Sequence, residues 1–134
     1  MLDSTVVITA ERMGQTAYEM LEAVAKQAGD QQIAISVVTV LELSHGLMRA
    51  DTLQRRAARQ RFLDDLLAGM PVYPVTIAIA MRAGEIDGRL QTAGETIALA
   101  DLLIGATALE LGHAVGTGNL RHFERIPGLI VKKL

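Results

Sequence analysis

Short β-branched runs that alternate with long helical patterns constrain the fold of this chain more than any other feature of its sequence. The clearest run, 33–38, reads Ile-Ala-Ile-Ser-Val-Val and passes directly into a helical pattern over 39–49. Further short strand patterns occur at 71–75, 113–116 and 129–131. Because crossover connections return a chain to the same strand direction, this alternation predicts an α/β fold with a parallel sheet covered on both faces.

Helical patterns fill most of the remaining sequence. Apolar residues recur there at spacings of three and four, and a glycine or a capping threonine marks several of the ends. The segment 98–111 is apolar almost all round, which predicts a helix buried in the middle of the domain. The other predicted helices are 14–29, 55–69 and 76–93.

Size and composition narrow the class of protein. The chain has 134 residues, which fits one domain over 1–134. Hydrophobic residues make up 50% of the sequence and charged residues only 21%, so we expect the surplus to cover a homodimer interface or a bound companion. No run approaches the ~18 apolar residues of a membrane span, and the absence of cysteine and of a signal-peptide pattern favours the cytoplasm. A net charge of −2 and an aromatic content of 3% do not by themselves indicate nucleic-acid binding.

Three acidic residues stand where such a sheet carries its site. Asp3 follows the first residues, Glu42 follows the predicted strand 33–38, and Asp101 lies in the first turn of the helix predicted at 98–111. Since ligands bind at the carboxyl ends of parallel strands, we expect the three carboxylates to meet at one rim. Converging carboxylates repel one another and offer hard oxygen ligands, which suits Mg²⁺ or Mn²⁺. Asp101 is the most informative acid, because its neighbours are apolar and a lone buried carboxylate is costly.

Each acid also has a purely structural interpretation. Glu42 stands three residues after Thr39, and Thr-x-x-Glu is a capping box in which the glutamate only ties back to the backbone. Asp101 can simply complement the N-terminus of its helix, and an acid as near the chain start as Asp3 is usually solvated. The functional interpretation rests on all three acids reaching the same end of the sheet.

Four stretches, taken in order, resemble the successive motifs of PIN domains. They read Leu-Asp-Ser-Thr-Val-Val-Ile at 2–8, Ser-Val-Val-Thr-Val-Leu-Glu-Leu at 36–43, Ile-Ala-Leu-Ala-Asp-Leu-Leu-Ile-Gly-Ala-Thr-Ala at 97–108, and Val-Gly-Thr-Gly-Asn-Leu-Arg-His-Phe at 115–123. The resemblance covers nearly the whole chain, and this compact form is similar to the VapC-type toxins of type II toxin–antitoxin systems. It implies a three-layer α/β/α fold with a central parallel β-sheet, and one PIN domain over 1–134.

The resemblance also implies an activity, namely metal-dependent endoribonuclease cleavage of RNA phosphodiester bonds by the toxin of a toxin–antitoxin pair. Its partners would be an RNA substrate and a cognate antitoxin. Asp3, Glu42 and Asp101 would ligate Mg²⁺ or Mn²⁺, and Asn119 would complete the catalytic set.

Supporting residues are implied as well. Thr117 would lie beside Asn119 on the fourth side of the site, and the hydroxyls of Ser4 and Thr5 would hold Asp3. Many PIN domains carry a fourth acid where this chain has Asn119 and His122, so the number of metal ions stays open. We leave His122 outside the predicted site, since a histidine at a surface turn is usually solvated.

The start of the chain departs from the family pattern too. Only Met1 and Leu2 precede the first aspartate, where the family has a longer central strand. The resemblance implies that 6–11 begins a helix, whereas the β-branched residues of 6–8 favour a strand by propensity. We follow the resemblance and expect a helix.

Two other classes of protein remain open. A phosphoryl-transfer domain of the receiver or haloacid-dehalogenase type is disfavoured, because Asp3 has no acidic neighbour and Thr5 occupies the place of the phosphatase's second acid. A catalytically inactive PIN-like binding module would keep the fold without the metal, and Asn119 in place of an acid keeps this alternative open. A measurement of metal affinity distinguishes this inactive module from a metal-dependent enzyme.

Overall fold

A parallel sheet of short strands forms the centre of the computed structural model, which describes residues 1–29 and 31–134. The strands pair in parallel as β1 (Ile35–Ser36) with β2 (Val72–Tyr73), and as β3 (Val115–Thr117) with β4 (Val131–Lys133). Leu2 joins the two pairs, because it forms parallel bridges to both Ile35 and Gly116. The order across the sheet is therefore β2–β1–Leu2–β3–β4.

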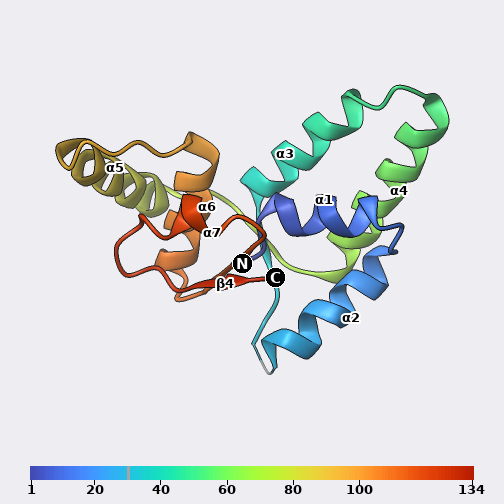
Figure 1. The fold of residues 1–134 in the computed structure, drawn as a ribbon, viewed down its shortest axis with the longest axis horizontal. Helices are drawn as coiled ribbons and strands as arrows, with labels where there is room; N and C mark the ends of the chain where they lie inside the picture. The colour runs from blue at the N-terminus through green and yellow to red at the C-terminus, as the bar shows by residue number, and fades with distance from the viewer. Residues whose placement is uncertain (30) are drawn as a thin grey trace.

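Helices cover both faces of this sheet. They are α1 (Ser4–Arg12), α2 (Ala17–Ala28), α3 (Val37–Met48), α4 (Leu53–Gly69), α5 (Ile77–Thr92), α6 (Leu99–Glu110) and α7 (Leu120–Phe123). Figure 1 shows α5, α6 and α7 on one side of the strands, with α1, α2, α3 and α4 on the other. The predicted α/β class, with three layers and a central parallel sheet, is confirmed.

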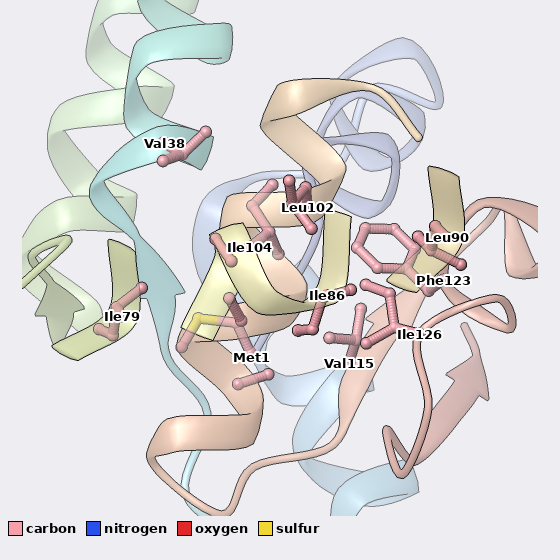
Figure 2. Close-up of a cluster of buried hydrophobic side chains, with 13 residues drawn as sticks. Met1, Val38, Ile79, Ile86, Leu90, Leu102, Ile104, Val115, Phe123 and Ile126 are labelled. Atoms are coloured by element: carbon pink, nitrogen blue, oxygen red, sulfur yellow. The ribbon is translucent and has the colours of Figure 1, made fainter. Parts of the chain in front are cut away.

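Two hydrophobic clusters lie between the sheet and its helical layers. Met1 and Val115 belong to the cluster against α5 and α6, which Figure 2 shows together with Phe123. Leu2 and Ile35 belong to the cluster against α1, α2 and α4. The consecutive residues Met1 and Leu2 thus face opposite layers, as the alternation of side chains along a strand requires. Both faces of the sheet are consequently buried.

Capping side chains explain where the structure departs from the sequence-based boundaries. The strand predicted at 33–38 is shorter in the structure, where β1 covers only Ile35–Ser36. Its last two residues are helical, because Ser36 Oγ accepts a hydrogen bond from Val38 N (3.2 Å) and begins α3 at Val37. The helix implied near 6–11 is correct, and the strand propensity of its β-branched residues is overridden. Asp3 caps that helix, and the apolar side chains of the helix pack into the cluster around Leu2.

The remaining boundaries agree with the prediction to within a few residues. The segments 14–29, 55–69, 76–93 and 98–111 are helical as α2, α4, α5 and α6. Thr76 Oγ1 accepts from Ile79 N (3.3 Å) and caps α5 as expected. The last two strands each begin two residues later than predicted, at Val115 and Val131. Within 1–29 and 31–134, no helix has both the length and the apolar character needed to cross a bilayer.

Candidate active site

Asp3 lies directly after Leu2, at the carboxyl edge of the sheet, and is only 3% exposed. Its Oδ1 accepts a hydrogen bond from Ser4 N (2.7 Å), and its Oδ2 accepts from the hydroxyls of Thr5 (2.6 Å) and Thr117 (2.8 Å). The interpretation of Asp3 as a solvated acid is therefore wrong. Three donors hold one carboxylate in the interior, where an unpaired charge would be costly.

These contacts also test the implied support for Asp3. The Thr5 hydroxyl binds Asp3 as the resemblance implies. Ser4 differs, because it reaches Asp3 through its backbone amide and not through its hydroxyl. Thr117 has a larger part than predicted. It donates to Asp3, and it also accepts a hydrogen bond from Asn119 N (2.9 Å).

The capping-box interpretation of Glu42 is wrong. Ser36, and not Thr39, is the N-cap of α3, which places Glu42 in the second turn of that helix. Thr39 is fully buried, and its hydroxyl donates to the carbonyl of Leu2 (3.3 Å). Glu42 therefore has no capping duty, and its carboxylate is free for another role.

The carboxylate of Glu42 is in an unfavourable environment. Among the described residues, its Oε2 is buried and has no hydrogen-bond partner. Burial raises the pKa of Glu42, the Ser4 side chain lowers it, and the charges of Asp3 and Asp101 raise it further. The pKa is raised overall, so the Ser4 hydrogen bond does not offset burial and repulsion, and a cation would stabilise the ionised form.

Asp101 lies in the first turn of α6, which suits an acid at a helix N-terminus. Its side chain is 14% exposed, and its Oδ2 lies 2.8 Å from Nδ1 of His122. Burial raises the pKa of Asp101, His122 lowers it, and the charge of Asp3 raises it, with a net shift upward. Helix capping alone does not account for Asp101, since its carboxylate engages a histidine from α7.

Asn119 reaches the site indirectly. Its Nδ2 lies 2.8 Å from Nε2 of His122, whose other ring nitrogen contacts Asp101. Sequence reasoning excluded His122, although the structure places it between Asn119 and Asp101. The spacing of Asn119 and His122, three residues apart across the short helix α7, was the signal that could have indicated this contact.

The donor set suits a hard divalent cation. Asp3, Glu42 and Asp101 can supply carboxylate oxygens. The charge of Asp3 raises the pKa of both Glu42 and Asp101, so the three acids lie near one another. In the part of the chain that the structure describes, no three acidic or histidine side chains form a group closed enough to hold a metal ion as they stand. The unpartnered oxygen of Glu42 is the feature that a cation would satisfy.

A groove of about 430 Å³ runs beside the site between α1, α3 and α4. Its apolar lining consists of Val7, Ile8, Leu43, Leu47, Phe62 and Leu63. Arg12, Arg49 and Arg59 also line it, and Arg59 Nε is paired with Glu11 (2.7 Å). Glu42 lines the same groove, so an occupant would lie against one of the three acids.

A smaller pocket of about 170 Å³ opens on the other side of the site. Asp101, His122 and Arg125 line it together with the segment 96–98. The guanidinium of Arg125 donates to the carbonyl of Thr96 (2.7 Å), which fixes it at the rim. Asp101 is therefore reachable from solvent even though most of its side chain is covered.

An α/β/α domain that gathers three carboxylates near the carboxyl edge of a parallel sheet belongs to a class that carries its functional site at that edge. The family model of the PIN domain matches residues 1–129, and the chain belongs to the PIN-domain family. This membership excludes the receiver and phosphatase alternatives.

Relatives of this chain within the family include VapC ribonucleases, and the resemblance to VapC-type PIN domains is confirmed. This chain is 36% identical to Ribonuclease VapC10 of Mycobacterium tuberculosis over 92% of its own length and 84% of that protein. It is 29% identical to Ribonuclease VapC2 of Rickettsia felis over 98% of this chain and 95% of that protein.

Solved structures of VapBC complexes also resemble this chain in fold. The fold matches VapBC2 from Rickettsia felis bound to a promoter DNA fragment with a TM-score of 0.83 and 27% identity, over 100% of this chain and 97% of that one. DNA-bound VapBC from Salmonella typhimurium matches with a TM-score of 0.82 and 25% identity, over 99% of this chain and 96% of that one.

Proposed function

We propose that this chain is a divalent-metal-dependent endoribonuclease, with Asp3, Glu42 and Asp101 as metal ligands and Asn119 as a further site residue. The buried, unpartnered oxygen of Glu42 carries the proposal. A buried carboxylate oxygen without a donor is costly unless a cation completes its coordination. The relatives' description as ribonucleases supports RNA as the substrate.

Mg²⁺ or Mn²⁺ at this site would supply an activated water and would neutralise charge on the phosphate. The residues of the chain hold the site in shape. Three donors fix Asp3, helix α3 carries Glu42 to it, and α6 carries Asp101. Hydrolysis of the phosphodiester would join a water oxygen to phosphorus and break the bond from phosphorus to the 3′ oxygen, which would take a proton. The products are 5′-phosphate and 3′-hydroxyl ends.

The groove beside Glu42 supports the assignment of the chain as the toxin of a toxin–antitoxin pair. Solved relatives are VapBC assemblies, one of them described as a member of a family of toxin–antitoxin systems. An amphipathic antitoxin segment would pack apolar side chains against Ile8 and Phe62 and present acids to Arg12 or Arg49. Such a segment would cover Glu42 and block the site. We expect a short reading frame for this antitoxin beside the gene.

Assembly and location complete the proposal. We propose that residues 1–134 act as a single PIN domain and form a homodimer. The exposed pairs Val37 with Leu41 on α3 and Ile77 with Met81 on α5 provide apolar surface for a second copy. The absence of cysteine supports activity in the reducing cytoplasm.

A binding module without catalysis is the second candidate. The amide of Asn119 in place of an acid and the open arrangement of the three carboxylates favour it. It predicts that the purified chain binds RNA or a partner protein but does not bind Mn²⁺ through Asp101.

Cleavage of a mixed cellular RNA by the purified chain tests the proposal. The assay compares wild type with Mg²⁺ or Mn²⁺, wild type with chelator, Asp101→Asn, and Asp64→Asn as a matched control on the exposed side of α4. Cleavage by wild type and Asp64→Asn alone, with 5′-phosphate ends, is the expected result. Equal cleavage by Asp101→Asn would show that the site is wrong.

If nothing cleaves the RNA, a calorimetric titration with Mn²⁺ decides between the candidates. Binding that Asp101→Asn removes would keep the metal site and reject only this RNA pool as substrate. Absence of binding by the wild type would favour the non-catalytic module.

A further inference from the structure

A continuous chain of polar contacts links two of the three acids. From Asp3 Oδ2 it runs to the hydroxyl of Thr117 (2.8 Å), and from that hydroxyl to the backbone amide of Asn119 (2.9 Å). The side chain of Asn119 then meets Nε2 of His122 (2.8 Å), and Nδ1 of His122 meets Oδ2 of Asp101 (2.8 Å). We call these five residues the polar relay. It joins the acid at the sheet edge to the acid on α6.

The ring of His122 is fixed although it lies near the surface. Its side chain is 50% exposed, but both ring nitrogens have partners, Asn119 on one side and Asp101 on the other. The next residue, Phe123, is fully buried and anchors α7 against the core. Since the helix and the ring are both held, His122 meets Asp101 in one defined orientation.

The contact leaves Asp101 able to bind a cation. His122 engages Oδ2, and a carboxylate has a second oxygen that can coordinate metal while the first accepts a hydrogen bond. Residues that hold a metal ligand in this way are known to set its orientation and basicity. A ring donor on Oδ2 also offsets the repulsion that Asp101 experiences from Asp3.

We propose that His122, oriented by Asn119, is a positioning residue that fixes the orientation of the Asp101 carboxylate, with Oδ2 engaged by the ring and the second oxygen left for the metal. This inference rests on the proposed function, since it takes Asp101 as a metal ligand. His122 thereby supports the site from the stretch in which many PIN domains carry a fourth acid. Asn119 also gains an indirect role, through the histidine and not through the metal.

Two conservative substitutions separate the two contacts of the ring. The amide nitrogen of His122→Asn occupies the place of Nδ1 and can still donate to Asp101, but it does not reach Asn119. The amide of His122→Gln occupies the place of Nε2 and can still meet Asn119, but it is displaced from Asp101. Glu124→Ala, at an exposed position beside α7, is the matched control.

Mn²⁺ affinity of the full chain, measured by calorimetry, is the readout, with circular dichroism to show that each variant is folded. His122→Ala and His122→Gln are expected to weaken Mn²⁺ binding by about 10- to 100-fold, the range for loss of a residue that supports a metal ligand. His122→Asn is expected to stay within about fivefold of wild type, less than the lower end of that range. Glu124→Ala is expected to match wild type.

Two results would overturn the inference. Unchanged Mn²⁺ affinity in folded His122→Ala would show that Asp101 needs no support from the ring. Nitrogen hyperfine coupling to Mn²⁺ that is present in the wild type and lost in His122→Ala would show that His122 is itself a ligand. Asp101→Asn in the same titration keeps the two proposals apart. If Asp101→Asn loses Mn²⁺ binding while His122→Ala keeps it, only the positioning role is rejected. If Asp101→Asn binds Mn²⁺ as wild type does, the metal site itself is rejected.

Discussion

Thr117 donates its hydroxyl to Oδ2 of Asp3 over 2.8 Å, although 114 positions separate the two residues in the sequence. Thr117 is fully buried in β3, and the same hydroxyl accepts from Asn119 N. One side chain thus fixes the first acid and starts the loop that leads to α7. The site depends on the two ends of the sequence meeting.

Replacing that hydroxyl tests its importance. Thr117→Val keeps the shape of the side chain but removes the donor to Asp3 and the acceptor for Asn119 N. Because hydrogen bonds to charged groups contribute about 1.5–3 kcal/mol, we expect a loss of about that size in the free energy of unfolding, measured by urea denaturation. Thr117→Ser keeps the hydroxyl and should lose less than half as much. Equal losses in the two variants would show that packing, and not the hydrogen bond, matters.

The raised pKa of Glu42 predicts that its ionised carboxylate, proposed as a metal ligand, lowers the stability of the fold. A carboxyl whose pKa is higher in the folded state than in the unfolded state destabilises the fold at neutral pH, and this cost disappears as pH falls below its unfolded value. Glu42→Gln removes the charge. In chelator near pH 7, we expect it to be more stable than wild type by less than about 1 kcal/mol, because solvent screens a half-buried group.

The advantage of Glu42→Gln should shrink toward about pH 4, near the unfolded pKa of a glutamate. Glu85→Gln, at an exposed position on α5, is the control and should be neutral. Thermal unfolding at both pH values measures the effect. A Glu42→Gln variant less stable than wild type at neutral pH in chelator would contradict it.

Metal binding should weaken as pH falls. Glu42 and Asp101 both have raised pKa values, so protons compete for their oxygens at a higher pH than they would for free carboxylates. We expect Mn²⁺ affinity to fall as the pH is lowered from about 7 toward about 4, with the fall beginning above the ordinary carboxyl range. Calorimetric titrations across that range give the profile, and an affinity independent of pH would exclude the two acids as ligands.

Metal removal should lower the stability of the folded chain. A ligand that binds only the folded state stabilises it by about 2.7 kcal/mol at a hundred times its Kd. We therefore expect Mn²⁺ to raise the unfolding temperature of the wild type and chelator to reverse the rise. The same additions should leave Asp101→Asn unchanged, and an equal rise in that variant would indicate binding elsewhere.

Two helical glycines offer a matched pair for the packing of α6. A methyl group at Gly105 would collide with the buried side chain of Ile126 and touch Leu129, whereas one at Gly84 on α5 would meet nothing. We expect Gly84→Ala to stabilise the chain by about 0.5–1 kcal/mol, the usual gain in a helix interior. Gly105→Ala should destabilise it by about 1–3 kcal/mol through overpacking. Urea denaturation compares the free energies of unfolding of the two variants. Equal gains would show that the side chains around Ile126 rearrange to accommodate the methyl group.

The three acids could be proposed as a site from sequence because each lies at a junction between a strand and a helix pattern. Their surroundings could not be found. Asp3 reads as a solvated acid until the fold brings Thr117 to it, and the cap of α3 at Ser36 is visible only once Ile35 and Ser36 form the end of a strand. Patterns report local periodicity, whereas these contacts join distant segments.

His122 illustrates the same limit. An exposed histidine in a short turn has no periodic signature, and the neighbour that gives it a role, Asp101, is on another helix. The helix at the start was also decided by distant contacts. The β-branched residues there favour a strand locally, but the cap at Asp3 and burial of Val6 and Val7 against the core stabilise a helix. Tertiary packing overrides a propensity that amounts to a fraction of a kilocalorie per mole.

The place of Leu2 in the middle of the sheet, between β1 and β3, bears on synthesis of the protein at the ribosome. A nascent chain that has emerged only as far as α6 can pair Leu2 with Ile35, but it leaves the other edge of Leu2 bare until Gly116 follows. Thr117, Asn119 and His122 emerge in the same late stretch. The chain therefore cannot complete the surroundings of Asp3 until the segment around Thr117 has emerged, which would give the proposed antitoxin time to meet the chain as it folds.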